Sequence, residues 1–196
     1  MARPGRKEHV LDAAVTLFGR KGYHGTTVRD IARESGMLSG SLYAHIDGKE
    51  DLLFEIVARA ADRFMVAVQP IAGGFGPASD KLRRAMAAHI RVVAGSRDAA
   101  TVFLHEWTAL SPQRRALIAE KRDAYEALFA RIIREGVDCG EFRPLDERFA
   151  RLTVLSALNW LYAWYTPGGP LGSDEVADKF AELFLEGFRQ EGACRS

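Results

Sequence analysis

Residues 26–53 read TTVRDIARESGMLSGSLYAHIDGKEDLL, and this stretch decides the fold class of the chain. Its spacing predicts two short helices, over about 27–34 and 38–45, joined at Ser35-Gly36. Glycine can adopt the left-handed backbone conformation that a sharp turn after a helix requires. The second helix is poor in charge and carries small polar residues with one tyrosine, so it is suited to lie against a partner rather than to fill a core. The pattern is that of a helix-turn-helix.

One helix before this stretch and a longer one after it complete the N-terminal part. Apolar residues recur at helical spacing over 6–21, and Gly22 ends that segment. After Asp47 and Gly48 a helix is predicted from about 48 to 69, where Pro70 and the following GGFGP run end it. The sequence therefore predicts a helix-turn-helix domain at 1–50 and a second domain at 51–196, with the helix from about 48 to 69 linking the two.

The rest of the chain is also predicted to be helical, over about 79–93, 97–110, 112–135, 145–165 and 173–190. No run of alternating β-branched residues is present, so the predicted fold class is all-α. The last two helices are apolar on more than one face, which requires burial on more than one side. The simplest structure that would bury the second apolar face is a homodimer, in which a partner subunit packs against it. The residues expected at that interface are Leu158, Leu161, Phe180, Phe184 and Phe188.

Composition limits the class of protein. At 196 residues and 47% hydrophobic residues, the chain fits one large core or two modest ones, and no apolar run approaches the ~18 residues of a membrane span. Residues 1–46 carry seven Lys and Arg against four Asp and Glu, a net charge of +3, whereas the chain as a whole is +1. The excess lies where a polyanion would bind. Cys139 and Cys194 lack metal-ligand or redox spacing, so a cytoplasmic protein without metal or cofactor is expected.

Residues 6 to about 57 closely resemble the N-terminal domain of the tetracycline-repressor (TetR) family of bacterial transcriptional regulators. The features that carry the resemblance are Phe18, Gly22-Tyr23, Thr26-Thr27, Ile31-Ala32, Gly36, Gly40, Leu42-Tyr43 and Lys49-Glu50. The resemblance implies a homodimer that binds double-stranded DNA at a palindromic operator, most often as a repressor. It also implies that the residues beyond about 60 form an effector-binding and dimerisation domain.

Each matched position has a physical role toward DNA. Thr27 is placed to cap a helix whose free amides face a phosphate, and Lys49 lies beside another helix N-terminus. Gly40 and the small hydroxyl residues around it would let the third helix approach base edges in the major groove. The residues expected to contact DNA are Thr27, Arg29, Ser39, Gly40, Ser41, Tyr43, His45 and Lys49. Alternatively, Thr27 is only a cap, Tyr43 packs inside the domain, and Arg29 belongs to a solvated face.

Three positions depart from the family pattern. Leu38 stands where a capping Ser or Thr is usual, so the third helix begins less firmly. Ile46 replaces an aromatic residue, and Asp47 replaces a common proline. These changes affect the exact placement of the third helix.

A second resemblance involves the segments FLHEWTAL (103–110), RRALIAEKRDAYEALFARIIREG (114–136) and LSALNWLYAWYTPGG (155–169). They look like the branch of the family that responds to acyl-coenzyme A thioesters and controls catabolic pathways. Aromatic walls with a few polar groups suit an apolar tail, and the residues expected to bind it are Trp107, Asn159, Trp160 and Trp164. Basic residues such as Arg114 would meet the phosphates. Alternatively, the tryptophans belong to the core or dimer interface, and the basic residues to a solvated face.

Rival classes have less support. His105-Glu106 is not followed by a second histidine at zinc-binding spacing, and no glycine-rich phosphate loop or nucleophile elbow is present. The chain is therefore not expected to be an enzyme. The pattern leaves two further functions open: a regulator of a multidrug or other hydrophobic-ligand response, and a helical ligand-binding scaffold that has lost DNA binding.

Overall fold

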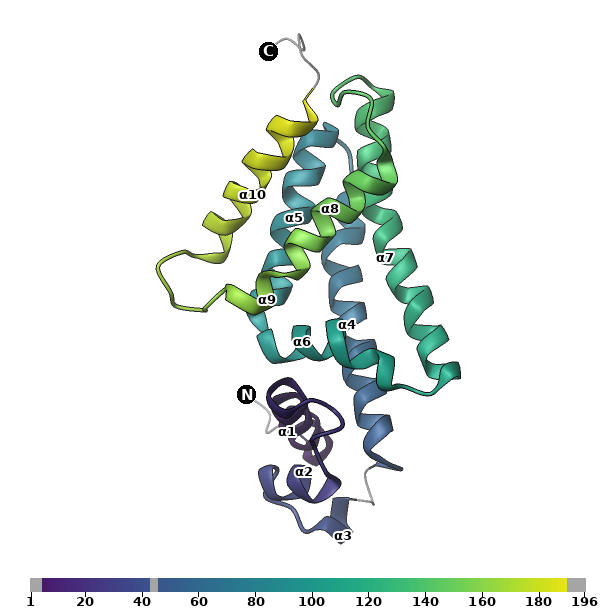
Figure 1. Cartoon of the computed structure of the whole chain (residues 1–196), viewed down its shortest axis with the longest axis vertical. Coiled ribbons are helices and arrows are strands. Elements are labelled where there is room, and N and C mark those ends of the chain that lie inside the picture. The colour runs from purple at the N-terminus through teal and green to yellow at the C-terminus, as the bar shows by residue number, and fades with distance from the viewer. Residues whose placement is uncertain (1–4, 43–45, 190–196) are drawn as a thin grey trace. The chain divides into compact units, whose positions relative to one another are not determined.

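Figure 1 shows the computed structural model of the chain, which describes residues 5–42 and 46–189. In these two ranges all the regular elements are helices, and one isolated antiparallel bridge joins Phe142 to Arg189. The predicted all-α fold is confirmed.

The helices form two compact units, each built from two segments of the chain. The first unit combines Met1–Asp62 with Ser96–Glu120, and the second combines Arg63–Gly95 with Lys121–Ser196. This grouping differs from the predicted division at residue 50, because a segment from the middle of the chain folds with the N-terminal helices. Two long helices, α4 (Lys49–Ala72) and α7 (Pro112–Asp138), each contribute residues to both units.

The first unit is organised around α1 (Arg6–Lys21), which packs against α2 (Val28–Glu34) and α6 (Arg97–His105). The four-residue helix α3 (Ser39–Leu42) follows α2, and the 3-10 helix η1 (Glu106–Ala109) follows α6. Its core consists of apolar side chains from α1 to α4, among them Val10, Ala14, Phe18, Ile31, Leu42, Leu53 and Val57, each at most 1% exposed. The short helices of the helix-turn-helix thus depend on α1 and α4 for their hydrophobic contacts.

The second unit contains α5 (Ala78–Gly95), α8 (Glu147–Asn159), α9 (Leu161–Trp164) and α10 (Ser173–Phe188), together with the remaining parts of α4 and α7. Helix α10 lies along α5 in Figure 1. The Glu141 carboxylate accepts hydrogen bonds from the backbone N–H groups of Ala78 (2.9 Å) and Ser79 (3.0 Å). It therefore caps the free amides of the first turn of α5.

Two predicted helix boundaries are wrong. Helix α4 continues through Pro70 to Ala72, since a proline this close to the helix end removes only one backbone hydrogen bond. The predicted helix over 145–165 is interrupted, because Trp160 ends α8 as its C-cap and α9 is a separate short turn.

A glycine allows α1 and α6 to approach closely. A Cβ atom added at Gly19 would lie 2.9 Å from Asp98 Cβ and 3.1 Å from Asp98 Cα, closer than Cβ atoms pack. Because Gly19 is in a helix, alanine would ordinarily be the more stable residue there. At this position the close contact with the neighbouring backbone reverses that preference.

We therefore expect Gly19→Ala to lower the free energy of unfolding by about 1–3 kcal/mol, the usual cost of overpacking. Gly187→Ala is the matched control, because that glycine is also helical and no atom lies within 4 Å of its added Cβ. The control should be neutral or more stable by about 0.5–1 kcal/mol. Urea unfolding of both variants measures the difference. Equal stability of the two would show that α1 and α6 can move apart without cost.

Candidate nucleic-acid interface

The N-terminus of α2 is held by a capping box. Thr27 Oγ1 accepts a hydrogen bond from the Asp30 backbone N–H (3.1 Å), and the Thr27 N–H donates to the Asp30 carboxylate (3.0 Å). Hydrogen bonds from Thr27 also lower the pKa of Asp30. Thr27 is exposed. It is therefore a helix cap with its side chain at the surface, which leaves its expected contact with DNA as a prediction.

The turn between α2 and α3 has the geometry that its sequence predicts. Gly36 takes a positive φ of 68°, its N–H donates to the Arg33 carbonyl (3.2 Å), and the Met37 N–H donates to the Ala32 carbonyl (2.8 Å). This pair of bonds is the Schellman motif, which satisfies the last carbonyls of a helix. A side chain at position 36 would be strained, because L residues rarely adopt this φ. The turn fixes where α3 begins.

Helix α3 presents an open surface at Gly40. This glycine is exposed, and no atom lies within 4 Å of a Cβ added to it. Leu42 and Ile46, in contrast, are 0% and 7% exposed and hold the segment to the core. The backbone of Ser39 and Ser41 lies in α3. Tyr43 and His45 lie outside the described residues.

Leu38 occupies the N-cap position of α3. Its carbonyl accepts the Leu42 N–H (3.2 Å), but its side chain is 80% exposed and has no oxygen with which to cap the helix. The start of the helix that should enter the groove is thus uncapped by a side chain, as the sequence predicts.

Lys49 connects α4 to the loop that precedes α2. Its Nζ donates to the carbonyls of Tyr23 and Thr26, both at 2.8 Å, and lies 4.0 Å from the centre of the Tyr23 ring. Burial lowers the pKa of this ammonium. Two of its three N–H groups are engaged, so one is left for the phosphate contact that the sequence predicts. The structure adds a positioning role that sequence reasoning missed.

Two arginines of α2 differ in their availability. Arg33 forms an ion pair with Asp30 (3.0 Å), whereas Arg29 is exposed and has no ion pair with any described residue. Of these two arginines, Arg29 is therefore the one that no described carboxylate holds.

The segment after α6 is fastened to the helix-turn-helix by contacts that the sequence did not reveal. Glu106 of η1 accepts a hydrogen bond from the Tyr23 backbone N–H (2.9 Å), and Glu50 of α4 accepts one from the Ser111 N–H (3.0 Å). Arg114 of α7 forms an ion pair with Asp51 and lies over the Phe54 ring at 5.2 Å. The carboxylates of α4 hold Arg114, and its expected contact with ligand phosphates stays a prediction.

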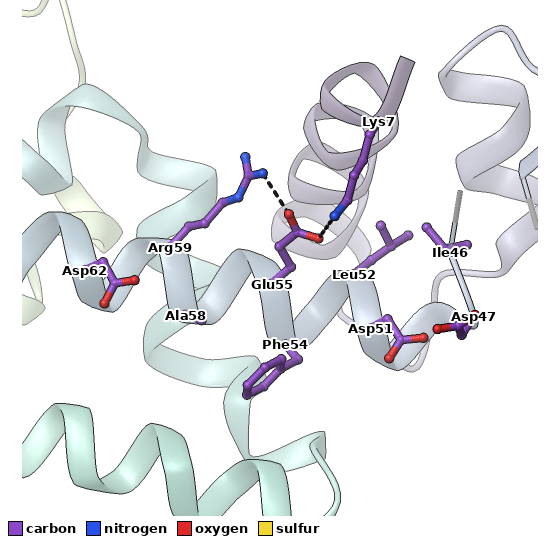
Figure 2. A pocket seen from close by; sticks show the side chains of 10 residues that line it. All are labelled: Lys7, Ile46, Asp47, Asp51, Leu52, Phe54, Glu55, Ala58, Arg59 and Asp62. Carbon is purple, nitrogen blue, oxygen red and sulfur yellow. Dashed lines mark hydrogen bonds and ion pairs between the residues drawn. The ribbon is translucent and has the colours of Figure 1, made fainter. Parts of the chain in front are cut away.

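A groove of about 410 Å³ follows the first turns of α4 (Figure 2). In this groove Glu55 forms an ion pair with Lys7 of α1 (2.8 Å), which joins α1 to α4, and another within α4 with Arg59 (2.7 Å). The ionisable residues that line it are Lys7, Asp47, Asp51, Glu55, Arg59 and Asp62. Four of these residues are carboxylates and two are cations, so the groove lacks the excess of positive charge that a nucleic acid or a phosphorylated ligand would favour.

The residues expected to bind an effector are divided between the two units. Trp107 is half-buried on η1 in the first unit, whereas Asn159, Trp160 and Trp164 belong to α8, α9 and the junction between them in the second. Trp160 and Trp164 are 59% and 45% exposed. These values favour the alternative in which the two tryptophans meet a partner subunit rather than enclose a ligand.

The expected dimer residues also fall into two groups. Leu158 and Leu161 are 0% exposed within their own protomer, so they cannot contact a partner, and this part of the expectation is corrected. Phe180 and Phe184 are half-buried with stacked rings, 6.3 Å apart. Phe188 is buried and packs edge-on against Phe142. The large apolar side chains that do remain exposed on α8, α9 and α10 and at the α8–α9 junction are Phe149, Leu152, Trp160, Trp164 and Leu183.

The described residues contain neither a metal centre nor a membrane span. No group of three or more His, Cys, Asp or Glu residues among them is arranged to hold a metal ion. None of the helices in the described ranges is long and apolar enough to cross a membrane.

Comparison with known proteins agrees with this geometry. Residues 10–56 match the family described as bacterial regulatory proteins, tetR family, and residues 76–188 match the tetracyclin repressor-like C-terminal domain. The transcriptional repressor KstR2 of Rhodococcus jostii RHA1 is 31% identical over 191 residues, covering 94% of this chain and 92% of the relative.

Two solved structures are similar over nearly their whole length. The ketosteroid transcriptional regulator KstR2 of Mycobacterium tuberculosis has a TM-score of 0.90 at 26% identity, covering 97% of this chain and 98% of that one. AibR, in complex with isovaleryl coenzyme A and operator DNA, has a TM-score of 0.83 at 28% identity, covering 91% and 97%.

The uncapped start of α3 leads to a prediction about operator affinity. Leu38→Ser supplies a capping oxygen, which stabilises a helix by about 1 kcal/mol. If binding requires a formed α3, affinity for operator DNA should rise about fivefold. Leu38→Ala is the control, since it removes the same exposed side chain without adding a cap. Anisotropy titration with a labelled duplex measures both variants. An equal gain in the two would assign the effect to the lost leucine and contradict the capping argument.

Proposed function

The chain belongs to the TetR family of bacterial DNA-binding transcriptional regulators, and from this premise we propose that it is a dimeric repressor that a small apolar effector releases from its operator. The observation that carries the proposal is the helix-turn-helix itself. Thr27, Gly40 and Arg29, which has no ion pair with any described residue, lie exposed along consecutive short helices whose turn is fixed by Gly36. Phosphate contacts would position the protein, and α3 would select the sequence.

We propose that the DNA contacts are those predicted from the sequence, with Lys49 acting in two ways. Its ammonium both fastens α4 to the loop before α2 and keeps one N–H for a phosphate. Because the operator lies on the bacterial chromosome, the regulator would act in the cytoplasm. The named relatives are transcriptional regulators, and we propose that this chain likewise has no enzymatic activity.

The proposed effector is an acyl-coenzyme A of a catabolic pathway. Support comes from two similar structures: AibR was solved with isovaleryl coenzyme A and operator DNA, and KstR2 is described as a ketosteroid regulator. A different hydrophobic ligand, as in a drug-response regulator, is the second candidate.

The contacts within the first unit suggest how an effector would act on DNA binding. Helix α7 continues from Arg114 into the second unit, and α4 continues from Asp51 in the same way. A movement of either helix would therefore be transmitted through the Arg114–Asp51 ion pair and through the hydrogen bonds from Lys49 to the Tyr23 and Thr26 carbonyls. A dimer reads two half-sites only when its recognition helices lie about 34–36 Å apart. The effector changes affinity only by its preference for one of the two states.

Salt dependence tests DNA binding. Binding to a duplex from the region upstream of the protein's own gene should weaken steeply with salt, as phosphate contacts require. Arg29→Ala should weaken binding and reduce the slope of log K against log salt by about one. Arg33→Ala, which removes a cation already paired with Asp30, should leave the slope unchanged. If no duplex binds in a salt-dependent manner, the chain is instead a scaffold that has lost DNA binding.

The effector proposal is tested on the same complex. Isovaleryl-, octanoyl- and decanoyl-coenzyme A are titrated into the preformed complex with DNA, and coenzyme A alone is the control. At least one thioester should release the duplex at a concentration where coenzyme A does not. If none changes the affinity, the acyl-coenzyme A proposal fails while the DNA-binding proposal stands.

The dimer proposal has a matched pair of variants. Leu183 on α10 and Val66 on α4 are both exposed aliphatic residues of the second unit, at 73% and 74% exposure. We propose that the partner covers the face that includes Leu183. Leu183→Glu should then shift the protein toward the monomer in sedimentation velocity, because a charge is buried without a partner. Val66→Glu should not. An unchanged dimer in Leu183→Glu would place the interface elsewhere.

A further inference from the structure

A pair of polar side chains is buried in the second unit without any role in DNA binding. His89 of α5 is 1% exposed and Tyr125 of α7 is 9% exposed, with the His89 Nδ1 and the Tyr125 hydroxyl 2.8 Å apart. Aromatic rings surround the pair: Phe64 of α4 lies 4.8 Å from the His89 ring, and Phe129 lies 5.7 Å from the Tyr125 ring. Three helices thus meet at one imidazole.

The imidazole is neutral. Burial lowers the pKa of His89 to about 3, so the ring carries a single N–H at physiological pH. Its position among aromatic rings explains this, because a charged imidazolium there would lose its hydration without gaining a counter-ion.

The hydrogen bond between the two residues determines where the ring proton lies. If the Tyr125 hydroxyl donates to Nδ1, both groups are satisfied and the proton is on Nε2. If Nδ1–H donates instead, the tyrosine proton and the Nε2 lone pair both lack partners. The first arrangement leaves only one unsatisfied group, so it is favoured. Nε2 is indeed buried without a hydrogen-bond partner. An unsatisfied buried N–H costs about 1–3 kcal/mol.

We propose that the Nε2–H of His89 binds a carbonyl oxygen of an apolar ligand that enters the core between α4, α5 and α7. The proposal rests on the effector-binding role given above and names the chemistry of that effector. A ligand that supplies an acceptor would satisfy the N–H that the protein leaves unsatisfied. The empty site is then less favourable than the occupied one, which is the condition for ligand recognition by a hydrogen bond.

The surroundings select the kind of acceptor. A carboxylate or phosphate here would be an anion beside a neutral ring and aromatic walls, which is a costly arrangement. A carbonyl carries an acceptor without a charge, and the carbon skeleton attached to it would pack against Phe64 and Phe129. The part of the ligand that enters this core is therefore an uncharged keto or acyl group with an apolar body, and any charged part of the same ligand would lie outside it.

A pair of probes with equal shape tests the proposal. Octan-2-one carries the carbonyl, and 2-methyloct-1-ene replaces its oxygen by a methylene group. The dissociation constants of both are measured by saturation-transfer NMR on the wild type and on His89→Phe. The preference for the ketone should fall about tenfold in His89→Phe, the equivalent of one hydrogen bond. Met86→Leu is the control, since Met86 is buried on the same helix and has no hydrogen-bonding role.

A second measurement starts from the wild-type protein without ligand. Long-range ¹H–¹⁵N spectra of ¹⁵N-histidine protein identify which ring nitrogen of His89 is protonated, and the proposal requires Nε2. Octan-2-one should shift that resonance and 2-methyloct-1-ene should not. The proposal is overturned if the proton is on Nδ1 or if neither probe binds. It is also overturned if His89→Phe keeps the preference for the ketone, because only water would then bind the Nε2–H of the wild type. DNA binding by the same preparation reports separately on the regulator function.

Discussion

The first unit depends on how the backbone of Tyr23 is held. Its N–H donates to Glu106, its carbonyl accepts from Lys49, and its ring lies under the Lys49 ammonium and 5.4 Å from Phe18. One peptide segment thereby joins α1, η1 and α4, three elements far apart in the sequence. The capping box of α2 begins only four residues later, so the position of the helix-turn-helix is fixed by contacts made just before it.

The two units differ at one buried polar group. In the first unit the half-buried ammonium and carboxylates of Lys49, Glu106 and Glu50 find partners within it, as stable structure requires. In the second unit the buried His89 keeps one nitrogen without a partner. A regulator needs a rigid DNA-binding unit, whose polar groups are satisfied. It also needs a second domain whose conformational free energy changes when a ligand binds.

The helix-turn-helix could be predicted from local sequence signals. The contacts between distant segments could not be predicted in this way. Gly36 and Thr27 act on residues within four positions, so their roles follow from the sequence. Glu106 and Arg114 act through partners more than sixty residues away, and nothing in their immediate neighbourhood identifies those partners. Leu158 and Leu161 show a further limit. The apolar periodicity of these residues indicates that they are buried. Whether they are buried within their own protomer or against a partner depends on tertiary packing, which a sequence pattern does not show.

The discontinuous first unit has a consequence for the order in which the protein folds as it is made. The DNA-reading helices leave the ribosome well before Ser96–Glu120, the segment that completes their unit, has been synthesised. Until then Tyr23 lacks the carboxylate of Glu106, and α1 lacks the helix that packs beside Gly19. The nascent N-terminal part is therefore incomplete during translation. For the same reason it is not a portable module, and transplanting residues 1–62 alone onto another sensor would leave one side of α1 uncovered.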